Sequence, residues 1–341
     1  MLLSDNITSL LRELCSDLTP VSTCPLCSSG SEQFKYLFNR WGFDHIECRN
    51  CKLVFINPEP SQELLNEIYE DLEYYTAWLK LIEEPALRKG ESLNYAMADV
   101  NEWYKYIVDE ILQWKQHGKW LDIGGGTGRL VKFINKYAPH FDTMLCETNH
   151  SASRLAEQYC GAKNVTWGEL EQQKGTFNVI TLIAVFEHIP DSVEFMRKLS
   201  GLLAPGGIIY MAIPRLGYLS QHISKKITYD IAPPMHLRFF SEKSMRYLCA
   251  KIHELKLCYL WQSGNKRFHI GHIFKPQWYE QTGMVPEREG IVHKRIIIYP
   301  PSTQSEKQLY RFIDWIDKIL SPVITRIDGQ RMLHCIIEKR N

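Results

Sequence analysis

The sequence predicts an α/β fold in which a mostly parallel β-sheet is covered by helices on both faces. Three observations predict it: a glycine cluster at residues 124–128, a change from strand-like to helical periodicity across that cluster, and a continued alternation of strands and helices as far as residue 214. Strands that alternate with helices at this spacing form parallel sheets that are buried on both sides.

The first of these elements is a strand, a tight turn and a helix. An apolar run ends at Ile123, and apolar residues then recur at helical spacing at Leu130, Val131, Phe133, Ile134 and Tyr137. Such a turn presents backbone N–H groups and a partly positive helix end at the carboxyl edge of a sheet, where a nucleotide-like ligand can bind. The later predicted elements are strands 141–147, 164–167, 177–185 and 208–214 and helices 151–159 and 191–203.

The spacing of the glycines excludes two common ligands. A dinucleotide fingerprint needs glycine at its first, third and sixth positions, but the sixth position is Arg129 when counted from Gly124 and Val131 when counted from Gly126. A phosphate loop is excluded because no Gly-Lys-Ser/Thr follows the turn. Taken alone, the remaining pattern also fits a plain tight connection.

The cysteines predict a metal site near the N-terminus. Two Cys-x-x-Cys pairs, Cys24 with Cys27 and Cys48 with Cys51, flank strand-like sequence. This is the spacing of a structural zinc site with four thiolate ligands and no open position. A redox Cys-x-x-Cys is the alternative, but it leaves the second pair unexplained. The remaining six cysteines lie singly and are expected to be free thiols in a reducing compartment.

The composition limits the class of protein. The chain has 341 residues, 45% of them hydrophobic, and a net charge of +1, which suits a globular protein with one large or two modest domains. That charge gives no footprint for nucleic acid or an acidic membrane. No apolar run approaches a membrane span, and the first 20 residues lack the features of a secretory signal, so a cytoplasmic protein is expected.

The motifs along the chain resemble those of one enzyme family. Asp122-x-Gly-x-Gly-x-Gly resembles the first motif of the class I S-adenosylmethionine-dependent methyltransferases, and the segment 184–191 resembles their fourth-strand motif. The sequence that begins at Cys48 is similar to that of bacterial members with an N-terminal zinc ribbon. The genes of those proteins are often found with those of sugar, polysaccharide or secondary-metabolite pathways. Those ribbons usually carry glycine where Lys52 stands.

The resemblance implies a Rossmann-like sheet whose last two strands, 255–262 and 331–339, pair antiparallel at one edge. It divides the chain into an N-terminal segment (1–20), a zinc ribbon (21–60), a helical linker or lid (61–116) and a methyltransferase domain (117–341) with an insertion at 263–330. Within that insertion, a capped amphipathic helix is expected over 305–320. Tyr74, Tyr75 and Trp78 are candidate lid residues.

The resemblance also implies the contacts of the cofactor. Asp122 would face its ammonium group, and the turn N–H groups its carboxylate. Glu147 would bind both ribose hydroxyls, and Glu169 the adenine amine. The cofactor-binding candidates are Asp122, Gly124, Gly126, Gly128, Glu147, Glu169 and Ala184.

Two histidines are candidate bases for the acceptor. His188 follows the fourth-strand motif, and His236 lies in the long connection 215–240 at the carboxyl edge, where such sheets carry substrate contacts. The predicted reaction is C- or O-methylation of a small molecule, such as a nucleotide-linked sugar or another biosynthetic intermediate. The oligomeric state is left open.

Two other functions fit part of the sequence. One is a zinc-ribbon RNA methyltransferase, against which the charge and the missing Asn/Asp-Pro-Pro-aromatic motif count. The other is a non-catalytic protein that binds the cofactor or serves as a scaffold.

Overall fold

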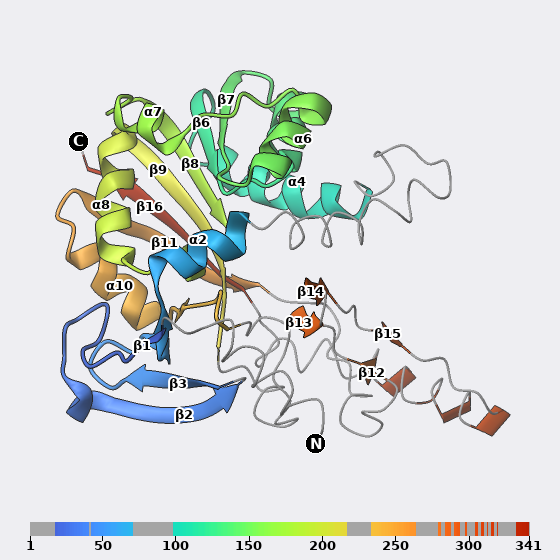
Figure 1. Cartoon of the computed structure of the whole chain (residues 1–341). Helices are drawn as coiled ribbons and strands as arrows, with labels where there is room; N and C mark the ends of the chain where they lie inside the picture. The colour runs from blue at the N-terminus through green and yellow to red at the C-terminus, as the bar shows by residue number, and fades with distance from the viewer. Residues whose placement is uncertain are drawn as a thin grey trace.

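The structure, a computed structural model, describes residues 18–40, 42–70, 98–216, 233–263 and 332–340, with short pieces between 279 and 319. Two sheets organise these residues (Figure 1). The larger has six strands in the order β11-β16-β9-β8-β6-β7, and the smaller has four in the order β10-β4-β3-β2. Among the described helices, none has the length and apolarity needed to cross a bilayer.

The large sheet confirms the predicted α/β class. Its strands are β6 (Gly118–Ile123), β7 (Phe141–Cys146), β8 (Phe177–Ile183), β9 (Leu203–Pro214), β11 (Leu255–Ser263) and β16 (Met332–Lys339). β6 to β9 run parallel, while β16 lies antiparallel between β9 and β11, as expected for the last two strands. β7 lies on one side of β6 and β8 on the other. The carboxyl ends of β6 and β8 are therefore the switch point at which such sheets bind ligands.

Helices cover both faces of this sheet (Figure 1). One face packs against α4 (Ala98–Leu112), α5 (Arg129–Tyr137) and α6 (His150–Cys160), and the other against α7 (Trp167–Glu171), α8 (Ser192–Leu202) and α10 (Glu242–Ala250). Alternate residues of β9 enter the two cores, because successive side chains of a strand point to opposite faces. Ile208, Tyr210 and Ala212 face the first core, and Ile209, Met211 and Ile213 the second.

One predicted strand is wrong. Residues 164–167 form only a single bridge, between Leu145 and Asn164. The Thr166 side chain accepts a hydrogen bond from Glu169 N, and Glu169 in turn accepts one from Thr166 N. This capping box begins α7 at Trp167, and the helix ends the extended stretch.

The small sheet forms the N-terminal part of the structure, which we call the cysteine ribbon (residues 18–60). It contains β1 (Leu18–Thr19), the short helix η1 (Ser31–Gln33), β2 (Phe34–Arg40), β3 (Phe43–Cys48), β4 (Val54–Asn57) and β5 (Glu59–Pro60). The fourth strand of the small sheet, β10 (Arg238–Phe239), comes from a segment much later in the sequence and pairs antiparallel with β4. We call residues 233–241 the β10 loop.

The remaining described elements lie outside these sheets. α2 (Gln62–Glu70) begins after Ser61, whose hydroxyl accepts the N–H of Leu64 as predicted. In the insertion, β12 (Tyr279–Glu280) pairs with β15 (Ile297–Ile298), and β13 (Met284–Glu287) with β14 (Gly290–His293). The candidate lid residues and most of the predicted helix 305–320 lie outside the described residues.

Candidate functional site

The glycine turn after β6 has the conformation that its sequence predicts. Gly124, Gly126 and Gly128 have φ angles of 64°, 57° and 74°, in the left-handed region that favours glycine. A Cβ atom on Gly124 would lie 2.5 Å from Val185 Cγ2, so the turn after β6 packs directly on the segment after β8. A ligand at this edge can therefore lie against bare backbone.

Asp122 lies beneath this turn at the end of β6. Its side chain is 2% exposed, and Thr181 on β8 donates a hydrogen bond of 2.7 Å to Oδ1. Oδ2 faces the turn, since a Cβ on Gly125 would lie 2.3 Å from it. Burial raises the pKa of Asp122 to about 7; the Thr181 hydrogen bond opposes this, and the nearby Glu147 charge adds to it.

Glu147 follows β7 and reaches the same turn. Its carboxylate accepts the N–H of Gly126 at 2.9 Å and the N–H of Asn149 at 2.8 Å. Burial raises its pKa, and these hydrogen bonds act in the opposite direction. An ionised carboxylate has about four acceptor positions, so these hydrogen bonds do not occupy all of them. Asp122 and Glu147 thus face one glycine turn from two neighbouring strands.

The two other cofactor candidates are placed differently. Glu169 is exposed, and its carboxylate is held by the backbone N–H and the hydroxyl of Thr166. Ala184 directly follows β8 with a φ of 54°, and its N–H donates to Ala212 O at 2.8 Å. A non-glycine residue in this conformation costs roughly 1–2 kcal/mol, and such strain is often found at functional sites. The cofactor contacts of both residues remain predictions.

The structure brings the two candidate histidines together. The rings of His188 and His236 lie 4.7 Å apart at an angle of 74°. His188 Nδ1 is 3.0 Å from the carbonyl oxygen of Met235. Because a carbonyl oxygen only accepts, Nδ1 is the donor in this contact. Burial, followed by the neighbouring His236, lowers the pKa of His188 to about 3, so the imidazole is neutral.

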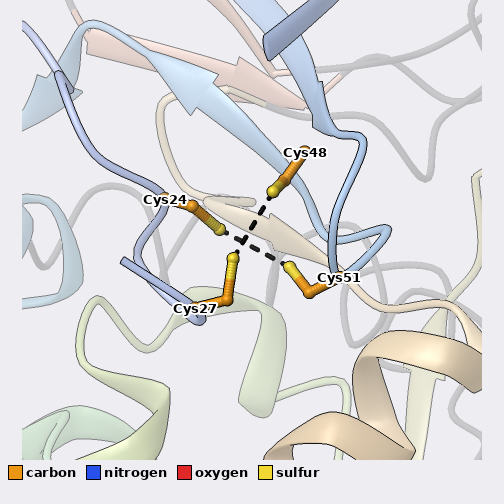
Figure 2. A group of neighbouring side chains, drawn as sticks. All are labelled: Cys24, Cys27, Cys48 and Cys51. Carbon is orange, nitrogen blue, oxygen red and sulfur yellow. Dashed lines mark hydrogen bonds between the residues drawn. The ribbon is translucent and has the colours of Figure 1, made fainter. Parts of the chain in front are cut away.

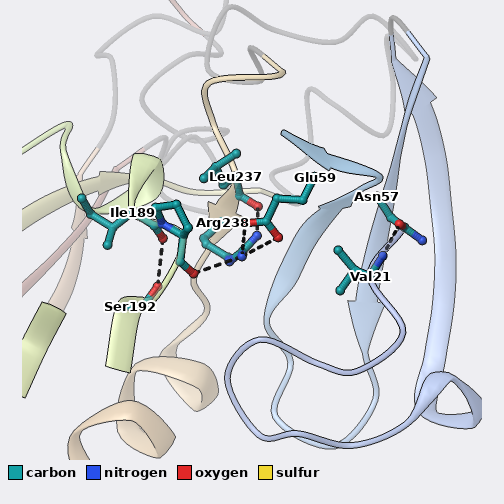
Figure 3. Close-up of polar contacts among 8 residues, drawn as sticks. Val21, Asn57, Glu59, Ile189, Ser192, Leu237 and Arg238 are labelled. Carbon is teal, nitrogen blue, oxygen red and sulfur yellow. Dashed lines mark hydrogen bonds and ion pairs between the residues drawn. The ribbon is translucent and has the colours of Figure 1, made fainter. Parts of the chain in front are cut away.

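The β10 loop that carries His236 is held by the cysteine ribbon. Leu237 N donates to Glu187 O at 2.9 Å, and Leu237 O accepts the N–H of Ile56 at 3.2 Å. Arg238 is 2% exposed and donates through Nη2 to both carboxylate oxygens of Glu59, at 2.6 and 2.7 Å (Figure 3). The same nitrogen donates to Pro190 O at 3.1 Å, in the segment that follows His188. Arg238 therefore connects the ribbon, through Glu59, with the β10 loop that carries His236 and with the segment that follows His188.

We expect Arg238→Lys to destabilise the protein by about 3–5 kcal/mol, because one ammonium group cannot reproduce the contacts that two guanidinium nitrogens make with Glu59, Pro190 O and Leu237 O. The measurement is urea unfolding. Arg246→Lys is the matched control, since Arg246 pairs with Glu242 at 2.8 Å with both side chains more than half exposed. That pair should contribute no more than about 1 kcal/mol. Equal losses in the two variants would contradict the structural role of Arg238.

The four predicted metal ligands form one cluster (Figure 2). One Sγ–Sγ distance of 3.5 Å joins Cys24 to Cys51, and another of 3.5 Å joins Cys27 to Cys48. Four sulfurs about 2.3 Å from one ion in a tetrahedron are about 3.8 Å apart, so the cluster fits a metal. The hydrogen bond with Cys51 lowers the pKa of Cys24 to about 5, whereas burial raises that of Cys48. Ionising all four thiols requires a cation.

The turns that follow the two cysteine pairs show how a lysine fits at position 52, where the sequence resemblance leads one to expect glycine. Ser28 and Lys52, each the residue after the second cysteine of a pair, have φ angles of 59° and 64°. These angles lie in the left-handed region that favours glycine, and at Lys52 a lysine adopts it. Lys52 also forms an ion pair of 2.9 Å with Glu47.

Sequence reasoning missed three residues of this site. Thr181 is a buried polar residue in an apolar strand, and that contrast was available in the sequence. Glu187 precedes a candidate base and is completely buried. Arg238 was visible only as one charge in an apolar loop, with no local signal for Glu59 as its partner.

Residues 96–252 match the model of a family described as a methyltransferase domain. This part of the chain is therefore similar to methyltransferase domains. The match contains the glycine turn, the histidine pair and the β10 loop, and it confirms the predicted class of enzyme. The cysteine ribbon lies outside it. The comparison with curated proteins gives no match.

Solved structures of methyltransferases are among those to which the chain is similar. An S-adenosylmethionine-dependent methyltransferase from Archaeoglobus fulgidus has 12% identity and a TM-score of 0.43, over 78% of this chain and 100% of that one. Coclaurine N-methyltransferase, bound to N-methylheliamine and SAH, has 14% identity and a TM-score of 0.42, over 73% of this chain and 74% of that one. Similarity at this level says nothing about the substrate.

Proposed function

We propose that the chain transfers a methyl group from S-adenosylmethionine to a small-molecule acceptor. The observation that carries the proposal is that Asp122 and Glu147 face one glycine turn at the switch point of the sheet. An acid beneath the turn suits the cofactor's ammonium group, and a second acid one strand away suits its ribose hydroxyls. The methyltransferase domain supports the same cofactor.

The reaction needs mainly alignment. The acceptor's lone pair forms the new bond to the methyl carbon while the methyl–sulfur bond breaks, and its electron pair stays on sulfur to give S-adenosylhomocysteine. Positioning of this kind can supply roughly 7–11 kcal/mol. A carbon or oxygen acceptor also loses a proton. We propose that this proton is removed at the edge of the sheet where His188 and His236 lie. Proton transfer by a positioned group can raise the rate about 10²- to 10⁴-fold.

We also propose that the cysteine cluster binds one structural zinc ion. The support is the four sulfurs within ligand distance of one another and two knuckle turns of matching form. With four thiolate ligands the ion has no open position, so its effect is on folding.

The acceptor class rests on sequence resemblance. We propose a nucleotide-linked sugar or a similar biosynthetic intermediate, methylated on carbon or oxygen. The free thiols of the described cysteines support a reducing compartment, and we propose the cytoplasm.

Calorimetry with S-adenosylmethionine tests the cofactor site. Glu147→Ala should weaken binding by roughly 1.5–3 kcal/mol, about 10- to 150-fold, because a hydrogen-bonded charge is lost. Gly126→Val should weaken it as well, since a β-branched residue does not tolerate the left-handed conformation at 126. Glu157→Ala, an exposed glutamate on α6, is the matched control.

The control should bind the cofactor as tightly as wild type. Wild-type protein that does not bind S-adenosylmethionine, or variants with equal affinity, would refute the proposed cofactor site. The chain would then retain a methyltransferase fold used for another purpose.

A further inference from the structure

Three side chains that can bind metal converge where the segment after β8 meets the β10 loop. They are Glu187 and His188, in the short helix η2 (Phe186–His188), and His236. One ligand atom from each lies within 4.8 Å of the other two. Glu187 is completely buried, while both histidines are half-buried, so the group has a closed side and an open side.

The orientation of His188 suits a metal ligand. Its Nδ1–H donates to Met235 O, and its Nε2 lies 3.8 Å from Oε1 of Glu187. A divalent cation between these two atoms would offset the cost of burying the carboxylate charge. A histidine that binds metal usually donates its other N–H to a carbonyl or a carboxylate, and the Met235 contact has this form.

The ligand set and the spacing are also suitable. Two imidazoles and one carboxylate bind divalent transition ions such as Mn²⁺, Fe²⁺ and Zn²⁺. Ligand atoms about 2.0–2.2 Å from one ion are about 3–4 Å from each other, so 3.8 Å already fits and small side-chain rotations bring in the third ligand. The thiolate cluster of the ribbon is softer and prefers zinc, which separates the two sites chemically.

We propose that Glu187, His188 and His236 bind a divalent cation that coordinates an oxygen of the methyl acceptor. This inference rests on the proposed function and specifies what the histidine pair does in it. Three protein ligands on a half-open site leave positions for the acceptor. A bound cation lowers the pKa of a coordinated hydroxyl or enol, so that its proton passes to solvent water. The acceptor would then carry a hydroxyl or carbonyl oxygen at the methylated atom or next to it.

Mn²⁺ is the probe, because it favours nitrogen and oxygen ligands over the ribbon thiolates. The full-length protein with its ribbon zinc is titrated with Mn²⁺, and the free ion is followed by electron paramagnetic resonance. Wild type should bind one equivalent. His236→Ala and Glu187→Gln should each weaken binding by at least about 100-fold, since even an indirect partner of a ligand contributes about 10- to 100-fold. His253→Ala, an exposed histidine after α10, should bind as wild type does.

Cofactor binding, measured on the same samples, separates this inference from the proposed function. Both ligand variants should keep their affinity for S-adenosylmethionine, which also shows that they are folded. A wild-type protein that binds no Mn²⁺, as expected if His188 and Glu187 instead share a proton, would overturn the metal site. So would wild-type Mn²⁺ affinity in a folded ligand variant. Normal Mn²⁺ binding without cofactor binding would refute only the proposed function.

Discussion

Cys24→Ser is expected to abolish binding of the proposed ribbon zinc and to release the β10 loop, while the affinity for S-adenosylmethionine is kept. A structural zinc contributes about 10–16 kcal/mol, which matches or exceeds the whole stability of a small domain, about 5–15 kcal/mol. Without it the ribbon should unfold. The β10 loop then loses β4 and Glu59, whereas Asp122 and Glu147 stand on strands that make no hydrogen bond to the ribbon sheet.

Metal analysis and amide hydrogen exchange measure this outcome. Protection at the amides of Ile56 and Leu237, which form the hydrogen bonds joining the ribbon, the β10 loop and η2, should fall by at least about 100-fold. Cys258→Ser on β11 is the control, with full zinc content and full protection expected. Unchanged protection at Leu237 in a zinc-free protein would mean that the β10 loop is held without the ribbon's metal.

The elements that could be predicted are those specified by local pattern. The glycine turn, the helix after it and the strands around it each carry their own periodicity. Their assembly into a parallel sheet follows from the order of strands and helices. The two cysteine pairs likewise predict their cluster, because two Cys-x-x-Cys pairs at this separation are typical of a metal site with four thiolate ligands. The antiparallel edge strands came from the family resemblance, since sequence periodicity alone does not assign direction.

The contacts that could not be predicted join distant parts of the chain. β10 has two residues, too few for any periodicity, and it pairs with a strand of the ribbon. The Arg238–Glu59 pair joins residues 179 positions apart, and either charge alone looks like an ordinary surface residue. The wrong strand at 164–167 has the opposite cause, because a local capping box at Thr166 prevailed over β-propensity. The ribbon's role as a support for the histidine segments was invisible for the same reason.

A second large effect is expected at Asp122, because a carboxyl that favours cofactor binding lowers the stability of the cofactor-free protein. The pKa of this carboxyl rises from 3.8 to about 7 on folding, mainly through burial. Between these two values the folded protein holds a proton that the unfolded chain releases, so stability falls as pH rises. The contribution is complete below about pH 4 and is lost as pH rises through 7. A shift of this size corresponds to about 4 kcal/mol as an upper limit.

Asp122→Asn should therefore remove this dependence and stabilise the cofactor-free protein above pH 7. Asparagine is neutral and keeps an oxygen for the Thr181 hydroxyl. The same change should weaken S-adenosylmethionine binding at pH 8 by roughly 1.5–3 kcal/mol, because the ammonium group loses a charged partner. Wild-type affinity should itself fall as pH drops below about 7, where Asp122 becomes protonated.

Urea unfolding and calorimetry at pH 5 and pH 8 measure both effects. Asp142→Asn, an exposed aspartate on β7, is the matched control and should change neither quantity. If Asp122→Asn keeps the pH dependence of wild type, the carboxyl is not the buried, proton-binding group described here. If it gains stability but keeps cofactor affinity, the ammonium group lies elsewhere and Glu147 alone carries the cofactor contacts from this edge. A variant that is more stable but binds S-adenosylmethionine more weakly is the result expected if Asp122 is buried for cofactor binding. Burial of this acid costs free energy, which is offset only when the ammonium group of the cofactor binds.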